Sequence, residues 1–327
     1  MMPRVSVVVP TYKRSELLTR CLDALLAQDF DAEDYEIIIV DDANWDETKR
    51  LVMLRAEKAR LYGHTLRCIP MTSTCSHGPA AARNAGWRAA QGEIIAFTDD
   101  DCIPCKEWLK AGVAAMVEGV AGVCGRLTVP IEGVPTDYEY NAAQLGANDF
   151  VTANCFYRRD VLLAVGGFDE RFTCAWREDS DLAFTLQAHG AVFASAPDAL
   201  VVHPVRPVPW GISIRQQRKS MFNALLYKKH PLLYHQNIQA TPPWHYYAIV
   251  CALLALVIGV VSGLGLLALA GLVLWVGLTT RFCMRRLRHT SHAPRHVMEM
   301  IVTSVAIPPL AIFWRLRGAM KFRVFFL

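Results

Sequence analysis

The sequence predicts an α/β fold, a doubly wound and mostly parallel sheet with flanking helices, followed by an α-helical membrane region. Between residues 1 and 205, short β-branched runs alternate with stretches whose apolar residues recur at helical spacing. Residues 248–280 then form 33 consecutive positions without a charged side chain. Charge divides the chain in the same way. Residues 1–200 carry 19 Lys and Arg against 29 Asp and Glu, a net charge of −10, whereas residues 201–327 carry 15 against one, a net charge of +14.

The first 205 residues alternate between predicted strands and predicted helices. Val5–Pro10 is a β-branched run that ends at a proline, which suits a buried parallel strand, and apolar residues after Ser15 repeat at helical spacing. The same signals predict strands at 36–40, 66–71, 93–98, 121–129, 150–157, 192–194 and 200–202. They predict helices at 15–26, from Asn44 or Asp46 to about 61, and at 80–90, 108–117, 158–165 and 178–190. Residues 131–149 have no clear period.

Polar or acidic residues follow three of these strands: Pro10-Thr11-Tyr12, Asp41-Asp42 and Asp99-Asp100-Asp101. The carboxyl ends of parallel strands open onto one edge of a sheet, and ligands bind there. Three adjacent carboxylates repel one another, and a divalent cation would make the arrangement favourable because hard cations take oxygen ligands. A solvated acidic turn is the alternative. Neither a dinucleotide fold nor a P-loop is supported, since the sequence has no Gly-x-Gly-x-x-Gly or Gly-x-x-x-x-Gly-Lys motif.

The spacing of the cysteines argues against a zinc ribbon, and the placement of the basic residues argues against nucleic-acid binding. Cys102 and Cys105 form one Cys-x-x-Cys pair, without the second pair that a zinc ribbon needs. No signal peptide precedes the first strand, so we expect the N-terminal part to stay in the cytoplasm, where free thiols are normal. The basic residues of the C-terminal part flank apolar runs and form no block of their own. This favours anionic membrane lipids over nucleic acid as their partner.

Six short segments stand in a recognisable order: Val5–Tyr12, Ile39–Asp42, Gly78–Gly86, Gly92–Asp101, Gly166–Glu170 and Glu178–Asp181. Each is a weak motif by itself, but together they resemble the motifs of a family 2 glycosyltransferase with the GT-A fold. The resemblance covers about residues 3–205. It implies a nucleotide-sugar donor, with a UDP-sugar favoured. The residues that it places at the nucleotide are Pro10, Thr11, Tyr12, Arg14, Asp41, Asp42, Arg83, Asp99 and Asp100.

The resemblance also implies a metal cofactor, Mg²⁺ or Mn²⁺. Asp99 and Asp101 match the two acids of an Asp-x-Asp metal motif, and Asp100 between them is a ligand, a sugar contact or a spacer. His203 resembles a histidine that some GT-A enzymes add to the metal shell, and a purely structural histidine is the alternative. A metal ion held there would stabilise the negative charge that builds up on the leaving diphosphate.

Asp179 resembles the catalytic base. The acceptor hydroxyl has to lose a proton as it attacks, and a carboxylate within hydrogen-bond reach can take it. The alternative is an acid in the first turn of a helix, which the helix dipole favours, and Glu178 or Asp181 can fill that structural role as well. We expect Trp176 and Glu178 on the acceptor side. Family members work by single inverting displacement, so no covalent nucleophile is needed.

The C-terminal part predicts a membrane anchor. As one helix, residues 248–280 would be about 50 Å long, against a hydrocarbon core of about 30 Å. Ser262–Gly265 divides the run, and basic residues flank both sides, which favours a hairpin with both ends on the catalytic side. The predicted domains are a catalytic domain at 1–205, a linker and juxtamembrane helix at 206–244, the hairpin at 245–280 and a basic segment at 281–327. We expect that last segment to be interfacial or re-entrant, with a third span as the alternative.

These observations predict a metal-dependent, inverting glycosyltransferase in the cytoplasmic membrane, multi-pass, with its catalytic domain in the cytoplasm. The acceptor is expected to be a hydroxyl or phosphate group, lipid-linked or part of an envelope glycan. The alternative is a membrane scaffold that binds a nucleotide sugar without turnover. A polymerising synthase is disfavoured, because Gln216-Gln217-Arg218-Lys219 lacks the tryptophan of the Gln-x-x-Arg-Trp motif that the resemblance would require.

Overall fold

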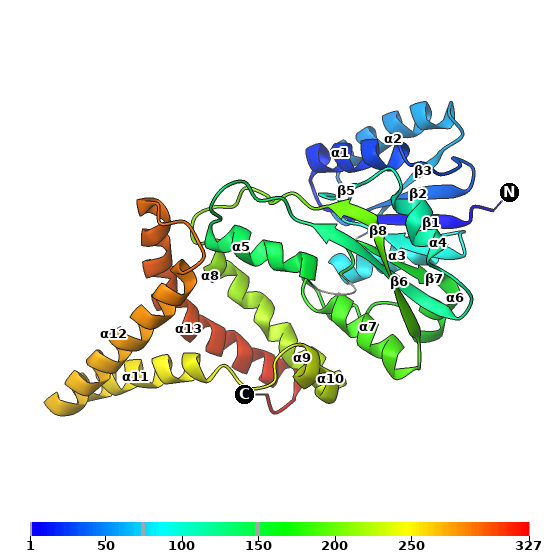
Figure 1. Cartoon of the computed structure of the whole chain (residues 1–327). Helices are drawn as coiled ribbons and strands as arrows, with labels where there is room; N and C mark the ends of the chain where they lie inside the picture. Colours follow the sequence, from blue (N-terminus) through cyan, green and yellow to red (C-terminus); the bar gives the residue numbers. More distant parts are fainter. Residues whose placement is uncertain (1, 73–75, 148–150, 327) are drawn as a thin grey trace. The chain divides into compact units, whose positions relative to one another are not determined.

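The computed structural model describes residues 2–72, 76–147 and 151–326, and residues 5–202 contribute the strands of a single sheet. The eight strands run in the order β3-β2-β1-β4-β7-β6-β8-β5 (Figure 1). They are β1 Val5–Thr11, β2 Tyr35–Asp41, β3 Thr65–Pro70, β4 Ile94–Phe97, β5 Ile103–Pro104, β6 Val120–Thr128, β7 Cys155–Arg158 and β8 Val192–Val202. Strands β3, β2, β1 and β4 are mutually parallel, so the carboxyl ends of β1, β2 and β4 meet at one edge.

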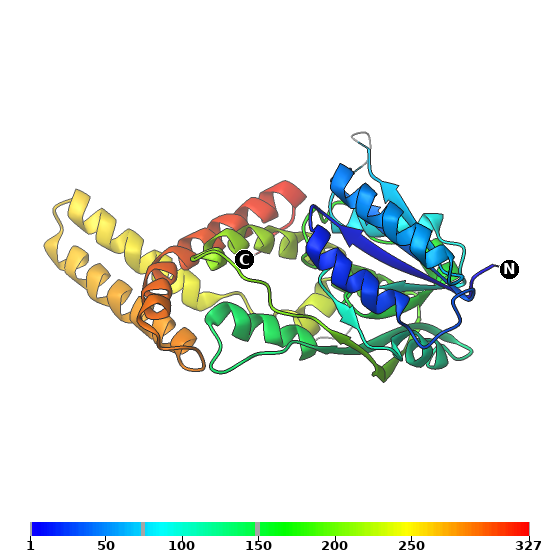
Figure 2. The ribbon, with the colours of Figure 1, turned by 90° about the horizontal axis from the view of Figure 1, so that it is seen from above.

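Helices cover both faces of the sheet because the strands are apolar on both sides. Val7 and Ile37 face one core with α1 and α4, whereas Val8 and Ile38 face another with α3, α6 and α7. In Figure 2, α1 and α2 lie side by side. The helices of this part are α1 Ser15–Leu26, α2 Asp46–Arg60, α3 Pro79–Ala89, α4 Trp108–Ala114, α6 Arg159–Val165 and α7 Glu178–Ala188. The predicted α/β class with a mostly parallel sheet is confirmed.

Several elements differ from the sequence prediction. The strand expected at 150–157 is β7 at Cys155–Arg158, antiparallel to both β4 and β6, and Phe150 lies outside the described residues. The strands expected at 192–194 and 200–202 are one strand, β8, because a register shift opposite Gly125 and Arg126 absorbs the interruption at Pro197. The aperiodic stretch at 131–149 contains α5 Asp137–Ala143 and the 3-10 turn Gln144–Ala147.

Contacts between Cα atoms divide the chain into two units. The first comprises residues 1–130 and 143–205 and holds the sheet, and the second comprises 131–142 and 206–327. The helices of the second unit after residue 205 are α8 Ile212–Gln216, the 3-10 turn η2 Gln217–Ser220, α9 Met221–Lys229, α10 Pro231–Asn237, α11 Trp244–Val261, α12 Gly265–Leu287 and α13 Pro294–Phe322. Among the described residues, α11, α12 and α13 are long and apolar enough to cross a membrane.

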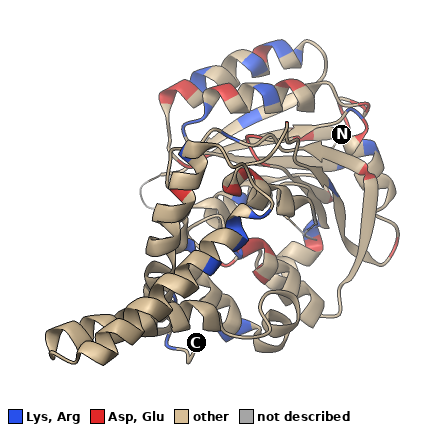
Figure 3. Ribbon diagram, turned by 60° about the vertical axis from the view of Figure 1, so that its left-hand side comes forward, with Lys and Arg blue, Asp and Glu red and all other residues tan. Residues whose placement is uncertain are grey.

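Helices α11 and α12 pack closely against each other as a hairpin, tan over most of its length in Figure 3 because it carries few charged residues. Two glycines explain the close packing. A Cβ atom at Gly259 would lie 2.4 Å from the backbone nitrogen of Ala268, and one at Gly271 would lie 2.4 Å from that of Leu256. Small residues that let helix backbones approach are typical of helix pairs in membranes.

Candidate active site

The register of the sheet brings the predicted site residues to one edge. Thr11 pairs with Asp41 across β1 and β2, and Val8 pairs with Phe97 across β1 and β4. Asp99, Asp100 and Asp101 come one residue after the end of β4, and Asp100 lies within hydrogen-bond distance of Thr11. The three carboxylates then diverge, and each one has different partners.

Asp100, the middle acid, is held by the protein itself. Its side chain is 3% exposed, and it accepts hydrogen bonds from Thr11 Oγ1 at 2.8 Å and from Arg14 Nη1 at 3.0 Å. Burial raises the pKa of Asp100, and the charge of Arg14 opposes that rise. Asp100 therefore orients Thr11 and Arg14, two residues that the sequence assigns to the nucleotide.

Asp99 pairs with Arg83, the central cation of the site. Arg83 lies in α3 with its side chain 3% exposed, and its Nη2 donates to Asp99 Oδ1 at 2.7 Å. Its Nη1 donates to Glu178 Oε1 at 3.0 Å. Burial alone would lower the pKa of Arg83, but the charges of Asp99 and Glu178 outweigh it and the pKa is raised. A single buried guanidinium thus joins the acidic strand end to the start of α7.

Glu178 opens α7 and is fixed on both sides. Its Oε1 accepts from Arg83, and its Oε2 accepts from the backbone nitrogen of Trp176 at 2.6 Å. Burial, together with the charge of Asp179, raises the pKa of Glu178 to about 7 against the opposing charge of Arg83. Asp179, next in sequence, is half-buried and accepts from the backbone nitrogen of Ser180 at 2.6 Å. Trp176 beside them is 38% exposed.

Asp101 lies beside His203 because β5 and β8 are antiparallel. Ile103 pairs with Val202, so the preceding Cys102 falls opposite His203. His203 Nε2 lies 3.6 Å from Asp101 Oδ1, and donor atoms of Asp101, Cys102 and His203 all lie within 4.8 Å of one another. His203 Nδ1 is buried and has no hydrogen-bond partner among the described residues. A carboxylate and an imidazole this close fit one divalent cation, and Cys102 is a neighbour that the sequence did not indicate.

The two acids at the end of β2, Asp41 and Asp42, accept hydrogen bonds from the loops that follow. Asp41 is fully buried and accepts from the backbone nitrogens of Ala43 at 3.1 Å and Trp45 at 2.6 Å, which closes the turn into α2. Asp42 accepts from His77 Nδ1 at 2.8 Å and from the backbone nitrogen of Gly78 at 3.0 Å, so it ties β2 to the start of α3. Pro10 is partly exposed at the same edge, and Tyr12 is 55% exposed.

Asn84 is a site residue to which the sequence assigned no role. It is fully buried beside Arg83 and its Nδ2 donates to the carbonyl of Phe168 at 2.8 Å. Its Oδ1 accepts from the backbone nitrogen of Phe168 at 2.9 Å and from Trp87 Nε1 at 2.8 Å. The available signal was its place in the Arg-Asn motif at the start of α3. Asn84 fastens α3 to the Gly-Gly-Phe-Asp-Glu turn and thereby fixes the position of Arg83.

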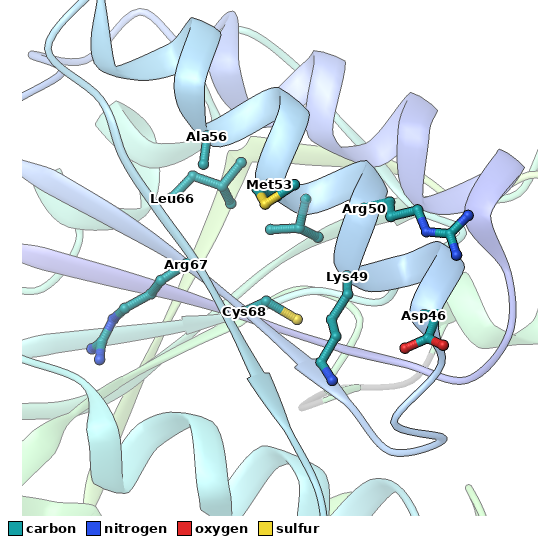
Figure 4. A pocket seen from close by; sticks show the side chains of 9 residues that line it. Asp46, Lys49, Arg50, Met53, Ala56, Leu66, Arg67 and Cys68 are labelled. Atoms are coloured by element: carbon teal, nitrogen blue, oxygen red, sulfur yellow. The ribbon is translucent and has the colours of Figure 1, made fainter.

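A separate pocket of about 600 Å³ lies between α2 and β3 (Figure 4). Asp46, Lys49, Met53, Leu66 and Cys68 are among its lining residues. None of the predicted site residues lines it, so the acidic edge and this pocket are different places on the same unit.

Comparison with known proteins identifies the family. The sequence model described as Glycosyl transferase family 2 matches residues 6–182, and that described as Glycosyl transferase family group 2 matches residues 136–284. The glycosyltransferase AglE of Haloferax volcanii is 30% identical over 219 residues, which are 63% of this chain and 68% of AglE. The poly(ribitol-phosphate) beta-N-acetylglucosaminyltransferase TarS of Staphylococcus aureus is 33% identical over 133 residues, 41% of this chain and 22% of TarS.

One further relative acts on a lipid-linked sugar, and two solved structures share the fold. The GalNAc(5)-diNAcBac-PP-undecaprenol beta-1,3-glucosyltransferase of Campylobacter jejuni is 33% identical over 137 residues, 40% of each chain. The mannosyltransferase PcManGT of Pyrobaculum calidifontis, solved with GDP-Man and Mn²⁺, has a TM-score of 0.61 at 20% identity and covers 98% of this chain and 88% of its own. Residues 1–349 of TarS with UDP-GlcNAc have a TM-score of 0.52 at 19% identity and cover 96% and 92%.

The raised pKa of Glu178 predicts a specific pH dependence of stability. A glutamate has a pKa near 4.5 when unfolded and Glu178 one of about 7 when folded, so the folded state holds the proton in between. Stability contributed by this group therefore falls as pH rises from about 4.5 to 7. Glu178→Gln has no proton to lose, so the stability of wild type relative to this variant should fall as pH rises across that window. Thermal unfolding in detergent from pH 5 to 8 measures this, and a difference that stays constant with pH would contradict it.

Proposed function

The chain belongs to glycosyltransferase family 2, and from that premise we propose that it moves a sugar from a nucleoside-diphosphate donor to a lipid-linked or envelope-glycan acceptor by a single inverting displacement. The enzyme class follows from the family. The observation that carries the rest is the Asp99–Arg83–Glu178 chain, because it brings Asp179 to the edge of the sheet where the acids of β4 emerge. The buried Arg83 then contacts both Asp99, on the donor side, and Glu178, the neighbour of the proposed base.

The donor occupies the edge formed by the ends of β1 and β2. Thr11 and Arg14 stand there in orientations fixed by Asp100, and Tyr12 offers an exposed ring. Asp42 lies at the end of β2, where a carboxylate suits a ribose hydroxyl or a base N–H. We favour a UDP-sugar because TarS, which is 33% identical over 133 residues, has been solved with UDP-GlcNAc, whereas PcManGT, solved with GDP-Man, is only 20% identical.

Asp101 and His203 would hold the divalent cation, whereas Asp99, the other acid of the Asp-x-Asp motif, pairs with Arg83 and lies outside that group. The short distance from His203 Nε2 to Asp101 Oδ1, within a group whose donor atoms all lie within 4.8 Å of one another, supports this assignment. When bound, Mg²⁺ or Mn²⁺ supplies a Lewis acid that stabilises the departing diphosphate. Arg83 adds a fixed positive charge on the same side, in a buried position where its field is weakly screened.

Asp179 takes the proton of the acceptor. In the displacement, the acceptor oxygen forms a bond to the anomeric carbon while the bond from that carbon to the diphosphate oxygen breaks, and the acceptor proton passes to the Asp179 carboxylate. Glu178 holds the loop by its two contacts and so positions its neighbour. Trp176, exposed beside Asp179, presents an aromatic face to an acceptor. A scaffold without turnover is disfavoured, since Asp99, Asp101 and Asp179 are all present.

Helices α11 and α12 form a membrane hairpin with both ends on the catalytic side, and α13 lies along the interface. Three contacts place α13 beside α8–α9. Gly211 N donates to Glu299 Oε1 at 2.7 Å, Lys228 Nζ donates to the carbonyl of Phe322 at 2.8 Å, and a Cβ at Gly318 would lie 2.3 Å from the carbonyl oxygen of Met221. The stretch from α8 to α9 carries Arg215, Arg218, Lys219, Lys228 and Lys229, which are too many charges for hydrocarbon. A helix aligned with it therefore lies at the anionic surface of the cytoplasmic membrane.

Replacing the base should stop transfer without stopping donor binding. Asp179→Asn removes the proton acceptor but keeps the shape, so we expect transfer to fall by about 10²–10⁴-fold. Binding of UDP, measured by calorimetry, should stay within about twofold since Asp179 lies off the nucleotide. Asp169→Asn, a substitution in the neighbouring turn, is the matched control. Normal turnover by Asp179→Asn would rule the base out.

Loss of the histidine should weaken the metal site. His203→Ala leaves Asp101 without the imidazole, and we expect the affinity for Mn²⁺ in the presence of UDP to fall about tenfold or more. Calorimetric titration of Mn²⁺ gives this value independently of turnover. His189→Ala, at the exposed end of α7, should bind Mn²⁺ as wild type does. Equal affinities in all three proteins would contradict the assignment of His203.

The proposed membrane topology predicts on which side of the membrane each of three inserted tags lies. An epitope inserted at Gly263, in the turn of the hairpin, should lie on the opposite side of the membrane from a tag at the N-terminus. A tag after the last residue should lie on the same side as the N-terminus, because α13 does not cross. Protease accessibility in right-side-out and inverted vesicles measures all three. Opposite sides for the two terminal tags would mean that α13 spans the membrane.

A further inference from the structure

The connection between β6 and β7 begins and ends at the acidic edge. Thr128, the last residue of β6, accepts a hydrogen bond from the backbone nitrogen of His203 at 2.8 Å. At the other end, the carbonyl of Ala153 accepts from Thr98 Oγ1 at 3.0 Å, one residue before Asp99. Residues 131–142 of this connection, however, belong to the same unit as the membrane helices. The chain therefore runs from the acidic edge into the unit that holds the membrane helices and then returns to the acidic edge.

A two-point ion pair fastens this segment to α12. Arg286 Nη2 donates to Asp137 Oδ2 at 2.8 Å and its Nε donates to Asp137 Oδ1 at 3.3 Å, with the two side chains 9% and 13% exposed. Arg286 Nη1 donates to Thr303 Oγ1 at 2.7 Å and to Ser304 Oγ at 3.1 Å. One guanidinium thus joins α5, α12 and α13, and its planar geometry fits a carboxylate at two points.

Further contacts hold residues 135–140 within this unit. Thr136 and Glu139 form a capping box at the start of α5: the backbone nitrogen of Thr136 donates to Glu139 Oε2 at 2.7 Å, and that of Glu139 donates to Thr136 Oγ1 at 3.3 Å. The backbone nitrogen of Ser291 donates to the carbonyl of Pro135 at 2.7 Å. Tyr140 stacks on His289 with ring centroids 5.9 Å apart.

We propose that the Asp137–Arg286 pair positions the acceptor, by holding residues 131–142 against the membrane helices from which a lipid-linked acceptor enters. This inference rests on the proposed function. A lipid-linked acceptor reaches the acidic edge from the bilayer, and 131–142 is the part of the β6–β7 connection that packs with the membrane helices. Asp137 and Arg286 touch no reacting atom. They are positioning residues, so we expect their loss to weaken binding of the acceptor and to leave binding of the donor unchanged.

The test compares four variants of the full chain in lipid nanodiscs. Asp137→Asn and Arg286→Met each leave one partner of a buried pair uncompensated, whereas the double variant Asp137→Arg with Arg286→Asp restores opposite charges. Arg285→Met is the matched control, since Arg285 is the exposed neighbour on the same helix. With polyprenyl phosphate as the acceptor probe, we expect each single variant to raise the acceptor KM at least tenfold and to leave the donor KM within twofold. The double variant should recover most of the loss.

A second measurement keeps the test decisive. Hydrogen exchange at the backbone amides of 135–143 should be at least tenfold faster in each single variant and should return towards wild type in the double variant. Unchanged exchange in the single variants, or acceptor and donor KM values that rise together, would overturn the proposal. Hydrolysis of the donor without acceptor reports on the proposed function separately. A wild type that neither hydrolyses a nucleotide sugar nor transfers to the probe would refute that function, and exchange would still decide the role of the pair.

Discussion

The catalytic unit depends on one constraint, the burial of the Arg83 guanidinium. A cation taken out of water is stable only if nearby charges and hydrogen bonds replace its hydration. Asp99 and Glu178 supply them from opposite directions, one from the end of β4 and the other from the start of α7. Because Arg83 must reach both, α3 has to lie close to the sheet. Gly86 permits this, since a Cβ there would lie 2.3 Å from Val8 Cγ1, and Asn84 locks the helix to the turn before α7.

The same constraint explains how three adjacent carboxylates coexist at a strand end. Each has its own cationic or polar partners: Asp99 has Arg83, Asp100 has Thr11 and Arg14, and Asp101 lies beside His203. Their mutual repulsion is therefore offset locally in the protein itself. Because their partners differ, we infer that the three acids have different roles. Asp100 orients Thr11 and Arg14, which the proposed function assigns to the nucleotide, Asp101 and His203 form the candidate metal site, and Asp99 connects through Arg83 to the loop of the proposed base.

The sequence predicted the fold class and the shared edge, because buried parallel strands and their carboxyl ends follow simple rules. It predicted the alternating helices from apolar residues at helical spacing, and the hairpin from an uncharged run that is too long for one membrane-spanning helix. It did not predict β5, a strand of two residues, and so gave no sign that Cys102 lies opposite His203. The partners of Arg83 and the hydrogen bond from Asn84 to Phe168 depend on contacts between residues 16 to 95 positions apart. Local periodicity carries no information on contacts of that kind.

The most direct test of the account is where a donor analogue and its metal bind. A structure of the full chain with UDP and Mn²⁺, with anomalous scattering recorded at the manganese edge, locates both. The account predicts one anomalous peak within coordination distance of Asp101 and His203, the nucleotide against Thr11 and Tyr12, and Arg83 still between Asp99 and Glu178. A manganese peak away from this edge, or a nucleotide in the pocket between α2 and β3, would contradict it.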